Sequence, residues 1–463
     1  MDYKDKKILL MGLGGFAKGS GVSCAEFLAS RGADLTITDL KSTKDLTHNL
    51  RPLKKFKNIK YVLGEHRTSD FENTHWVVKN PDVPPSSAFL SVARVRKTPI
   101  DNDITLFFRE YGVGRVIGVT GTRGKSTTTA LIYEMARRQF KSARFGGNIG
   151  ESPLRFLDEI KNGPAVLELS NFQLSDLDTI KMSPHVAVWT NLYPDHLNKY
   201  PSIAEYIADK EKIFQYQKAG DVAVLNLDNE ITKKIGEGLK KAVKGRHVLF
   251  FSLQQKPRDG AYIKNNWFVF VEGGKETKIC RTAETKLLGE HNLANTLAAI
   301  CAARFFGVGW PAIKLAIKKF KGVPNRLEVI KKIGGITFIN DCTATSPQAT
   351  IAALRSFALR RVVLITGGNS KGFSLEEMIE EIGEKAKAVV LMPGNVSGEI
   401  LRGAQGAQIP VKEVKDLKEA VRTARKLAQK GDYIILSPGL TWLPRQNEFA
   451  RGEEFRKIVK RLS

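Results

Sequence analysis

Residues close to position 120 have the types and spacing needed to bind a nucleotide triphosphate. The string Gly118-Val-Thr-Gly-Thr-Arg-Gly-Lys-Ser126 places two glycines before Lys125 and Ser126. Glycines leave backbone N–H groups free to bind phosphate oxygens, the lysine adds positive charge, and the serine hydroxyl is a suitable ligand for Mg²⁺. The usual P-loop has glycine at the position of Val119, so the match is to a compact variant. The alternative is that this string occurs by chance in a surface turn. The strand expected before it and the helix expected after it disfavour that alternative.

A carboxylate and a histidine follow the next two apolar runs. Glu168 lies near the end of residues 165–170, and His196 follows Asp195 in the loop after residues 186–190. In doubly wound sheets, ligands bind at the carboxyl ends of the strands. For either residue alone, a solvent-facing glutamate or an ordinary loop histidine is the simpler interpretation. Their shared position at strand ends predicts a metal site beside the phosphate loop.

Lys210 falls on the apolar stripe of a helix that we expect to begin at Ser202, with Glu205 completing a capping box. Such a lysine can simply extend to solvent or pair with an acid. The functional alternative starts from burial, which disfavours the charged ammonium form. A neutral amine could take up CO₂ as a carbamate, and the carbamate would be an anionic oxygen ligand for a metal.

These residues need a framework of strands and helices, which we predict to be α/β with three domains. Residues 1–112 have the pattern of a Rossmann-like domain, with a strand at 7–11, a glycine-rich turn and an acid after the second strand. This fingerprint suits NAD or the diphosphate of another nucleotide. Its candidate binding residues are Gly12, Gly14, Ser20, Gly21 and Asp39.

Residues 113–322 are predicted to form the P-loop domain, with a β-rich part between 220 and 286. Residues 323–463 repeat a strand-then-turn pattern at 336–341, 362–368, 389–394 and 433–439, typical of a second Rossmann-like domain. We expect this third domain to close on the nucleotide site as a substrate-binding lid.

The composition narrows the function classes. The chain has 463 residues, 42% of them hydrophobic, and a net charge of +25 from 73 basic and 48 acidic residues. That charge suits nucleic acid or anionic small molecules, and the lack of an aromatic-interleaved RNA-binding signature around the basic runs favours the latter. Four cysteines without metal-like spacing, no long apolar stretch and no signal-like N-terminus predict a cytoplasmic protein without a membrane span.

Several separated motifs, in this order, resemble the Mur ligase family over the whole chain. They are Thr120-Gly-Thr-Arg-Gly-Lys-Ser-Thr-Thr128, Gly146-Gly-Asn-Ile-Gly150, Glu168-Leu-Ser-Asn-Phe-Gln-Leu174, Thr190-Asn-Leu-Tyr-Pro-Asp-His196, His291-Asn-Leu-Ala-Asn295, Asn325-Arg326, Asn340-Asp341, Ser437-Pro-Gly439 and Asn447-Glu-Phe449. The Glu-Leu-Ser-x-Phe-Gln-Leu string resembles the D-glutamate-adding branch.

This resemblance implies a ligase of peptidoglycan synthesis, and so a role in cell-wall biogenesis, cell shape and division. ATP would phosphorylate the carboxylate of UDP-N-acetylmuramoyl-L-alanine, and D-glutamate would attack the acyl phosphate. Two Mg²⁺ (or Mn²⁺) ions would offset the charge of the reactants. The resemblance also implies a cytoplasmic monomer that binds neither nucleic acid nor membrane.

The resemblance implies roles for named residues. ATP would contact Gly121, Thr122, Gly124, Lys125, Ser126, Thr127, Asn292, Asn295, Arg326 and Asp341. The metal ligands would be Ser126, Glu168, His196 and Lys210 in its carbamylated form, and the catalytic residues Lys125, Asn148, His196 and Lys210. The five residues of the first glycine loop would bind UDP, and Thr345, Lys371 and Phe449 would bind the amino acid. From spacing alone, Asn292 and Asn295 could instead cap a helix.

The chain departs from the family's pattern at three places. Its first glycine loop is longer, Thr343 stands where many relatives have lysine, and Trp442 stands where serine is frequent. The alternatives are therefore a ligase of the same superfamily with another acceptor, including a folylpolyglutamate-type enzyme, and a basic P-loop ATPase that binds nucleic acid. A nicotinamide dehydrogenase would explain only the first glycine loop.

Overall fold

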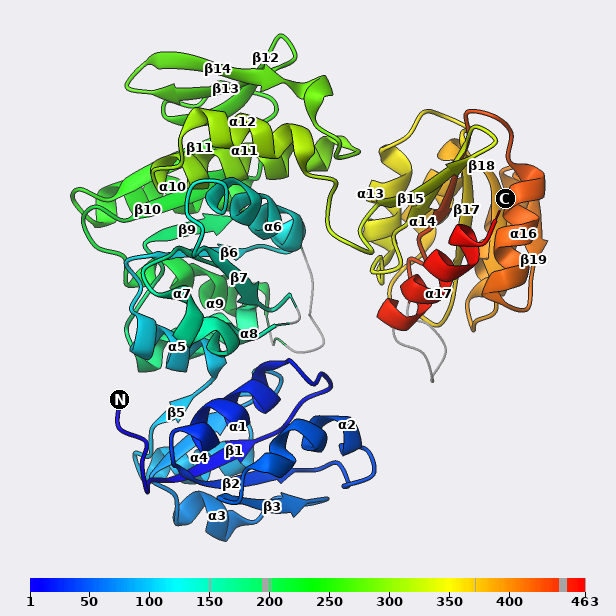
Figure 1. Ribbon diagram of the computed structural model, residues 1–463. Helices are drawn as coiled ribbons and strands as arrows, with labels where there is room; N and C mark the ends of the chain where they lie inside the picture. The colour runs from blue at the N-terminus through cyan, green and yellow to red at the C-terminus, as the bar shows by residue number, and fades with distance from the viewer. Residues whose placement is uncertain (150, 194–199, 201, 371, 441–447, 463) are drawn as a thin grey trace. The chain divides into compact units, whose positions relative to one another are not determined.

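The computed structural model describes the whole chain except residues 150, 194–199, 201, 371, 441–447 and 463. His196, Lys371 and Trp442 therefore lie outside the described residues. The predicted fold class is confirmed, because the chain forms three α/β domains, each built on one sheet (Figure 1). By their internal contacts, residues 1–285 and 294–318 form one compact unit, and residues 286–293 and 319–463 form a second.

The N-terminal domain has a parallel sheet in the order β3-β2-β1-β4-β5, as predicted for a Rossmann-like unit. Its strands are β1 (Lys7–Met11), β2 (Asp34–Asp39), β3 (Ile59–Leu63), β4 (Trp76–Lys79) and β5 (Ile100–Asp101). Its α-helices are α1 (Ser20–Ser30), α2 (Thr47–Leu50), α3 (Thr68–Glu72), α4 (Ala88–Val95) and α5 (Asp103–Tyr111). The apolar runs of β1 and β4 are buried on both faces, which is why they lie at the centre of the sheet.

The central domain has a nine-stranded sheet in the order β14-β13-β12-β11-β10-β9-β6-β8-β7. Its strands are β6 (Val116–Thr120), β7 (Arg144–Gly147), β8 (Ala165–Glu168), β9 (Val186–Trp189), β10 (Val222–Asn226), β11 (His247–Ser252), β12 (Gly260–Lys264), β13 (Trp267–Glu272) and β14 (Lys275–Arg281). Pairing is parallel from β7 to β12 and antiparallel through β13 and β14, which form the β-rich part.

Helices flank this sheet on both faces, as the alternation of strands and helices requires (Figure 1). They are α6 (Lys125–Ala136), α7 (Leu157–Ile160), α8 (Asn171–Leu174), α9 (Ile203–Gln215), α10 (Glu230–Ala242), α11 (Glu290–Phe305) and α12 (Trp310–Lys319). The largest hydrophobic cluster runs from the N-terminal domain into the central one and includes Phe27, Phe107, Leu154 and Trp189. These two domains therefore share a core.

A buried ion pair also joins these two domains. Lys79, at the end of β4, lies 2.8 Å from the Asp176 carboxylate, and its side chain is 1% exposed. Asn102 Nδ2 donates to the same carboxylate at 2.7 Å, while its side-chain oxygen Oδ1 accepts the N–H groups of Ile104 and Thr105 at the start of α5. Breaking such a pair leaves an uncompensated buried charge, so it constrains the junction.

The C-terminal domain has a sheet in the order β15-β16-β20-β17-β18-β19, antiparallel only between β15 and β16. Its strands are β15 (Glu328–Ile333), β16 (Ile336–Asn340), β17 (Val362–Gly367), β18 (Ala386–Met392), β19 (Val411–Glu413) and β20 (Tyr433–Leu436). Its helices are α13 (Pro347–Arg355), α14 (Glu376–Lys385), α15 (Ser397–Gly406), α16 (Leu417–Leu427) and α17 (Glu448–Lys460). The four strand runs read from the sequence are β16, β17, β18 and β20.

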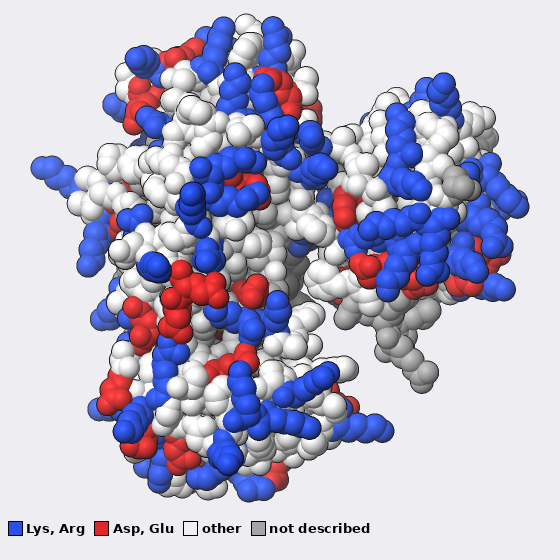
Figure 2. All heavy atoms as spheres, in the orientation of Figure 1, with Lys and Arg blue, Asp and Glu red and all other residues white. Residues whose placement is uncertain are grey.

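Basic side chains are spread over the visible surface of all three domains (Figure 2). Acidic side chains are interspersed among them, as the mixed composition requires. Among the described residues, no helix is long and apolar enough to cross a lipid bilayer.

Candidate functional site

The phosphate loop connects β6 to α6, and two of its residues must be glycine. Gly121 and Gly124 have φ angles of 149° and 80°. A Cβ on Gly121 would lie 2.0 Å from Thr190 Oγ1, and one on Gly124 would lie 2.1 Å from Asn295 Oδ1. The loop therefore packs too closely against its neighbours for any side chain at these positions.

Lys125 and Ser126 begin α6 directly after this loop. The Lys125 amine donates to the backbone oxygens of Gly121 (2.9 Å) and Thr122 (3.1 Å), so it lies along the loop. Ser126 and Thr127 are buried in the first turn of α6, where N–H groups and the helix dipole favour an anion. The predicted order of strand, glycine loop and helix N-terminus is therefore present.

The segment that follows β9 forms hydrogen bonds with the backbone of the phosphate loop. Thr190 Oγ1 donates to the Arg123 carbonyl oxygen at 2.6 Å, and Asn191 Oδ1 accepts the Arg123 N–H at 2.8 Å. The Thr122 N–H donates to the Asn191 carbonyl oxygen at 3.0 Å. Sequence reasoning assigned no role to Thr190 or Asn191, although both stand in one of the quoted motifs.

Glu168 ends β8 beside the strand that leads into the phosphate loop, in register with Val119. Its side chain is buried, and Oε1 accepts a hydrogen bond from Asn148 Nδ2 at 3.0 Å. The other oxygen, Oε2, is buried without a hydrogen-bond partner among the described residues. An unsatisfied buried carboxylate oxygen needs a cation or water, so the residues present fit the predicted Mg²⁺.

Lys210 lies on α9 and reaches the phosphate loop. Its side chain is 1% exposed, its amine donates to the Gly121 carbonyl oxygen at 3.2 Å, and it lies 4.7 Å from the centre of the Tyr206 ring. The alternative of a lysine extending to solvent is therefore wrong. Ser202 caps this helix by accepting the Glu205 N–H at 3.3 Å, which is one half of the predicted capping box; the described contacts do not include the return bond from the Glu205 side chain.

A polar network that sequence reasoning missed holds α9 in place. The Tyr200 hydroxyl donates to Asp209 Oδ2 at 2.8 Å and accepts from Asn171 Nδ2 at 2.7 Å. Lys212 bridges Asp209 and Asp178 at 3.0 and 2.8 Å. These contacts join α9, which carries Lys210, to the segment that follows Glu168, so they hold together the elements of two of the four predicted metal ligands. No local spacing signals such a network.

The two asparagines of α11 differ in their surroundings. Asn295 Oδ1 accepts from Thr128 at 3.3 Å, which places it against α6 and the phosphate loop. Asn292 Nδ2 donates to the Leu288 carbonyl oxygen at 2.7 Å, near the start of its own helix. Spacing left open whether these asparagines contact ATP or cap the helix. Asn292 has the contact of a helix-terminal residue, and Asn295 lies beside the phosphate loop.

The first glycine loop is built as a tight turn. Gly12 and Gly14 have positive φ, and a Cβ on Gly21 would lie 2.4 Å from the Gly12 carbonyl oxygen. Asp39 does not project freely from this loop, because its carboxylate accepts the N–H groups of Leu13 (2.8 Å) and Lys41 (2.9 Å). It therefore holds the loop's backbone.

Two asparagines beside this loop were not singled out from the sequence. Asn49 Nδ2 donates to the Gly14 carbonyl oxygen at 3.0 Å, and Asn80 Nδ2 would lie 2.6 Å from a Cβ on Gly14. Ser20 begins α1, and its hydroxyl oxygen is buried without a hydrogen-bond partner among the described residues. The loop thus has side-chain amides beside its backbone, which suits a sugar or uracil ligand as well as a diphosphate.

In the C-terminal domain, Asp341 is buried after β16. Its Oδ1 accepts the Leu327 N–H at 3.1 Å and its Oδ2 accepts from the Ser437 hydroxyl at 2.8 Å. Burial raises the pKa of Asp341 to about 7, although these hydrogen bonds oppose the shift. Arg326, which directly precedes Leu327, is exposed, and Thr345 is partly buried. Phe449 is 46% exposed.

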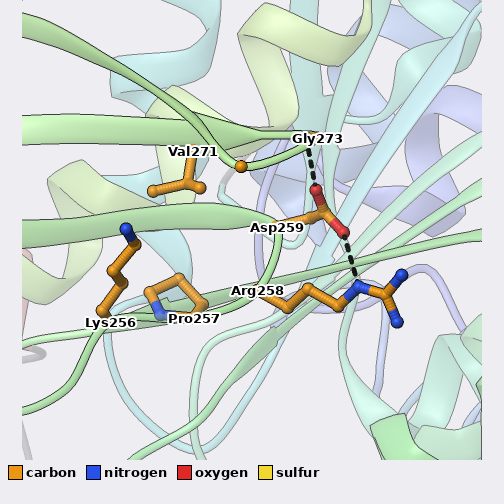
Figure 3. A pocket seen from close by; sticks show the side chains of 7 residues that line it. Lys256, Pro257, Arg258, Asp259, Val271 and Gly273 are labelled. Atoms are coloured by element: carbon orange, nitrogen blue, oxygen red, sulfur yellow. Dashed lines mark hydrogen bonds and ion pairs between the residues drawn. The ribbon is translucent and has the colours of Figure 1, made fainter.

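One described cavity, of about 610 Å³, lies in the β-rich part (Figure 3). Lys256, Pro257, Arg258, Asp259 and Val271 line it together with two glycines. Among the lining residues, the Asp259 carboxylate accepts the Gly273 N–H at 2.9 Å and lies 3.9 Å from Arg258 (Figure 3). None of the predicted site residues lines this cavity.

Comparison with protein-family models finds three matches in order along the chain. They are the Mur ligase MurD-like N-terminal domain over residues 6–101, the Mur ligase middle domain over 119–303, and the Mur ligase, glutamate ligase domain over 325–440.

Curated relatives match over nearly the full length. A protein of Roseiflexus sp. (strain RS-1) is 39% identical over 474 residues, covering 99% of each chain. Proteins of Acetivibrio thermocellus and Clostridioides difficile are 36% and 33% identical, covering 99% and 100% of this chain and 97% and 100% of theirs. All three are named UDP-N-acetylmuramoylalanine–D-glutamate ligase.

Solved structures agree in fold. A UDP-N-acetylmuramate–alanine ligase of Thermotoga maritima has a TM-score of 0.61 at 21% identity, covering 98% of this chain and 99% of that one. A pseudomurein peptide ligase of Methanothermus fervidus has a TM-score of 0.57 at 20% identity, covering 99% and 100%.

Proposed function

The chain belongs to the Mur ligase family, and we propose on that basis that it joins D-glutamate to UDP-N-acetylmuramoyl-L-alanine at the expense of ATP. This reaction makes a peptidoglycan precursor. The observation that carries the proposal is the meeting of Glu168, Asn148 and Lys210 with the phosphate loop in one domain. The names of the relatives support the identity of the two substrates.

The proposed reaction brings two anions together, so its main requirement is charge stabilisation. The carboxylate of the UDP-substrate attacks the γ-phosphorus of ATP, ADP leaves, and the resulting acyl phosphate is attacked by the amine of D-glutamate with loss of phosphate. Lys125 and the N-terminus of α6 stabilise the triphosphate, and Asn148 can donate to an oxygen of the transferred phosphoryl group. No side chain needs to act as a nucleophile.

We propose that Ser126 and Glu168 hold Mg²⁺, together with His196 and a carbamate formed on Lys210. The metal would offset the charge of the phosphate oxygens. The burial of Lys210 supports carbamate formation, because a buried amine favours its neutral, nucleophilic form. In the same proposal, the N-terminal loop binds UDP, Asn292, Asn295, Arg326 and Asp341 bind the adenosine part of ATP, and Thr345, Lys371 and Phe449 bind the amino acid.

We further propose domain boundaries at residues 112/113 and 322/323, a cytoplasmic location and a monomeric enzyme. The charge is compatible with small anionic substrates, and no described element has the form of a nucleic-acid-reading motif.

The test is phosphate release from ATP with UDP-N-acetylmuramoyl-L-alanine and a panel of amino acids. We expect turnover with D-glutamate to exceed that with L-glutamate, L-alanine, glycine and meso-diaminopimelate by at least about tenfold in kcat/KM, a difference of about 1.4 kcal/mol. Equal turnover across the panel would contradict the D-glutamate assignment, while turnover with none of them would contradict the ligase.

A further inference from the structure

The turn that carries Arg326 is held in an unfavourable backbone conformation. Asn325 has a φ of 67° and Leu327 a φ of 43°, so both neighbours of Arg326 lie in the left-handed region. Asparagine tolerates this region, but leucine is strained in it. Strained residues persist only where the surrounding structure imposes their conformation, and they concentrate where ligands are bound.

Hydrogen bonds impose the conformation of Asn325 from four sides. Thr343 Oγ1 donates to its carbonyl oxygen at 2.8 Å, and Glu328 Oε2 accepts its N–H at 2.8 Å. Its side-chain oxygen accepts from Asn340 Nδ2 at 2.9 Å and from Arg456 Nη2 at 3.2 Å. Backbone and side chain of this one residue are thus both fixed.

Leu327 is fixed in turn by Asp341. The Leu327 N–H donates to Asp341 Oδ1 at 3.1 Å, and the Ser437 hydroxyl holds the other carboxylate oxygen at 2.8 Å. Because Asp341 directly follows Asn340 at the end of β16, the same strand end fixes both neighbours of Arg326. The Arg326 side chain itself remains exposed.

We propose that Thr343 and Asn340 are positioning residues that fix the turn 325–327 and thereby aim the Arg326 guanidinium at the nucleotide. This inference rests on the proposed role of Arg326 in binding ATP. It gives Thr343 a function in this chain at a position for which the family resemblance implies lysine. A fixed guanidinium loses less conformational entropy when it binds a ligand than a mobile one does.

The test uses Thr343→Val, which removes the hydroxyl that donates to Asn325 and keeps a side chain of similar shape, with Thr343→Ser as the matched control. We expect Thr343→Val to raise KM for ATP between about twofold and tenfold, the effect of one hydrogen bond, with kcat and KM for D-glutamate little changed. Thr343→Ser should restore KM for ATP. A rise in KM for D-glutamate alone would overturn the proposal.

A double-mutant cycle with Arg326→Ala separates this proposal from the function on which it rests. If Thr343 acts through Arg326, Thr343→Val should change KM for ATP little when Arg326→Ala is already present. Additive effects of the two substitutions would overturn the positioning role and leave the proposed function intact. An Arg326→Ala variant with unchanged KM for ATP would contradict the role of Arg326 in nucleotide binding, and the positioning role with it.

A second pair of variants covers the case in which Thr343→Val does not fold. Asn325→Gly allows the left-handed backbone and removes the oxygen that Asn340 and Arg456 contact, whereas Asn325→Asp keeps that oxygen. We expect KM for ATP to rise in the glycine variant and to stay near that of the unaltered enzyme in the aspartate variant. Equal values for the two would overturn the proposal.

Discussion

Lys210 is a buried lysine beside a phosphate loop that is proposed to bind anions. We predict that Lys210→Ala lowers ligase turnover by at least about a thousandfold, because it removes either a carbamate ligand or the positive charge at the loop. Phosphate release measures the loss, and added bicarbonate should not restore it. Lys218→Ala, which alters an exposed lysine shortly after the same helix, should keep near-normal turnover.

The carbamate itself can be observed separately. With ¹³C-labelled bicarbonate, the unaltered enzyme should show a carbamate carbonyl signal by NMR, and Lys210→Ala should not. An active enzyme without such a signal would show that Lys210 is not carbamylated.

Glu168 offers a buried carboxylate oxygen that no described side chain satisfies. We predict that Glu168→Gln lowers kcat about a hundredfold to a thousandfold and raises the Mg²⁺ concentration needed for half-maximal rate, because the amide cannot supply the anionic ligand. Titration of the phosphate-release rate with MgCl₂ measures both. An unaltered Mg²⁺ dependence would show that Glu168 does not bind the metal.

Asp341 links stability to pH. Its pKa rises from 3.8 to about 7 on folding, mainly because it is buried, so the folded chain retains a proton that the unfolded chain loses. The free energy of unfolding should therefore fall as pH rises from about 4 to 7, and it should fall no further on account of Asp341 above about 7. Urea denaturation should show that the unfolding free energy of the unaltered protein, minus that of Asp341→Asn, drops by a few kcal/mol between about pH 5 and 8. A constant difference between the two proteins would contradict the shift.

Individual residues show how far local sequence could predict the site. The place of Lys210 on an apolar stripe was visible in helical spacing, although spacing alone left open a lysine that extends to solvent or pairs with an acid. Asp39 followed a strand as the fingerprint requires, yet its carboxylate holds backbone N–H groups, which depends on the path of a turn distant in sequence. Tyr200 and Asp209 were missed because their interaction follows from how a helix packs.

At the scale of elements, α17 approaches β16 closely because residue 452 is glycine. A Cβ there would lie 2.3 Å from Cys342 Sγ and 2.5 Å from Asn325 Oδ1. We predict that Gly452→Ala destabilises the protein by about 1–3 kcal/mol. Gly238→Ala, in α10 with no atom near its Cβ, should instead stabilise it by about 0.5–1 kcal/mol. Urea denaturation of both variants compares them, and a loss of stability in both would contradict the packing argument.

The elements themselves were largely predictable, because apolar runs at strand spacing mark β6, β8, β9 and most strands of the third domain. The edge strand β14 was not predicted, since its sequence is mostly polar, with lysines at both its start and middle and only the adjacent Ile279 and Cys280 buried. An edge strand needs no continuous apolar run, because one side remains open to water. The helix α6 begins directly after Gly124.

For the whole molecule, a charge of +25 should attract anionic substrates over long distances. We predict that raising KCl from about 50 to 500 mM raises KM for the UDP-substrate severalfold while kcat changes little, because salt screens surface charge more than buried contacts. Added DNA or RNA should not stimulate phosphate release. Stimulation by nucleic acid would support the alternative ATPase function.

The contacts from Thr190 and Asn191 to the phosphate loop bear on the energetics of nucleotide capture. The loop is tied to a strand end 70 residues further along the chain before any ligand arrives. The backbone of the loop therefore loses its conformational entropy during folding, so little further entropy is lost when the triphosphate binds. Calorimetry should accordingly find a small entropic penalty for ATP, which grows once Thr190→Val releases the loop.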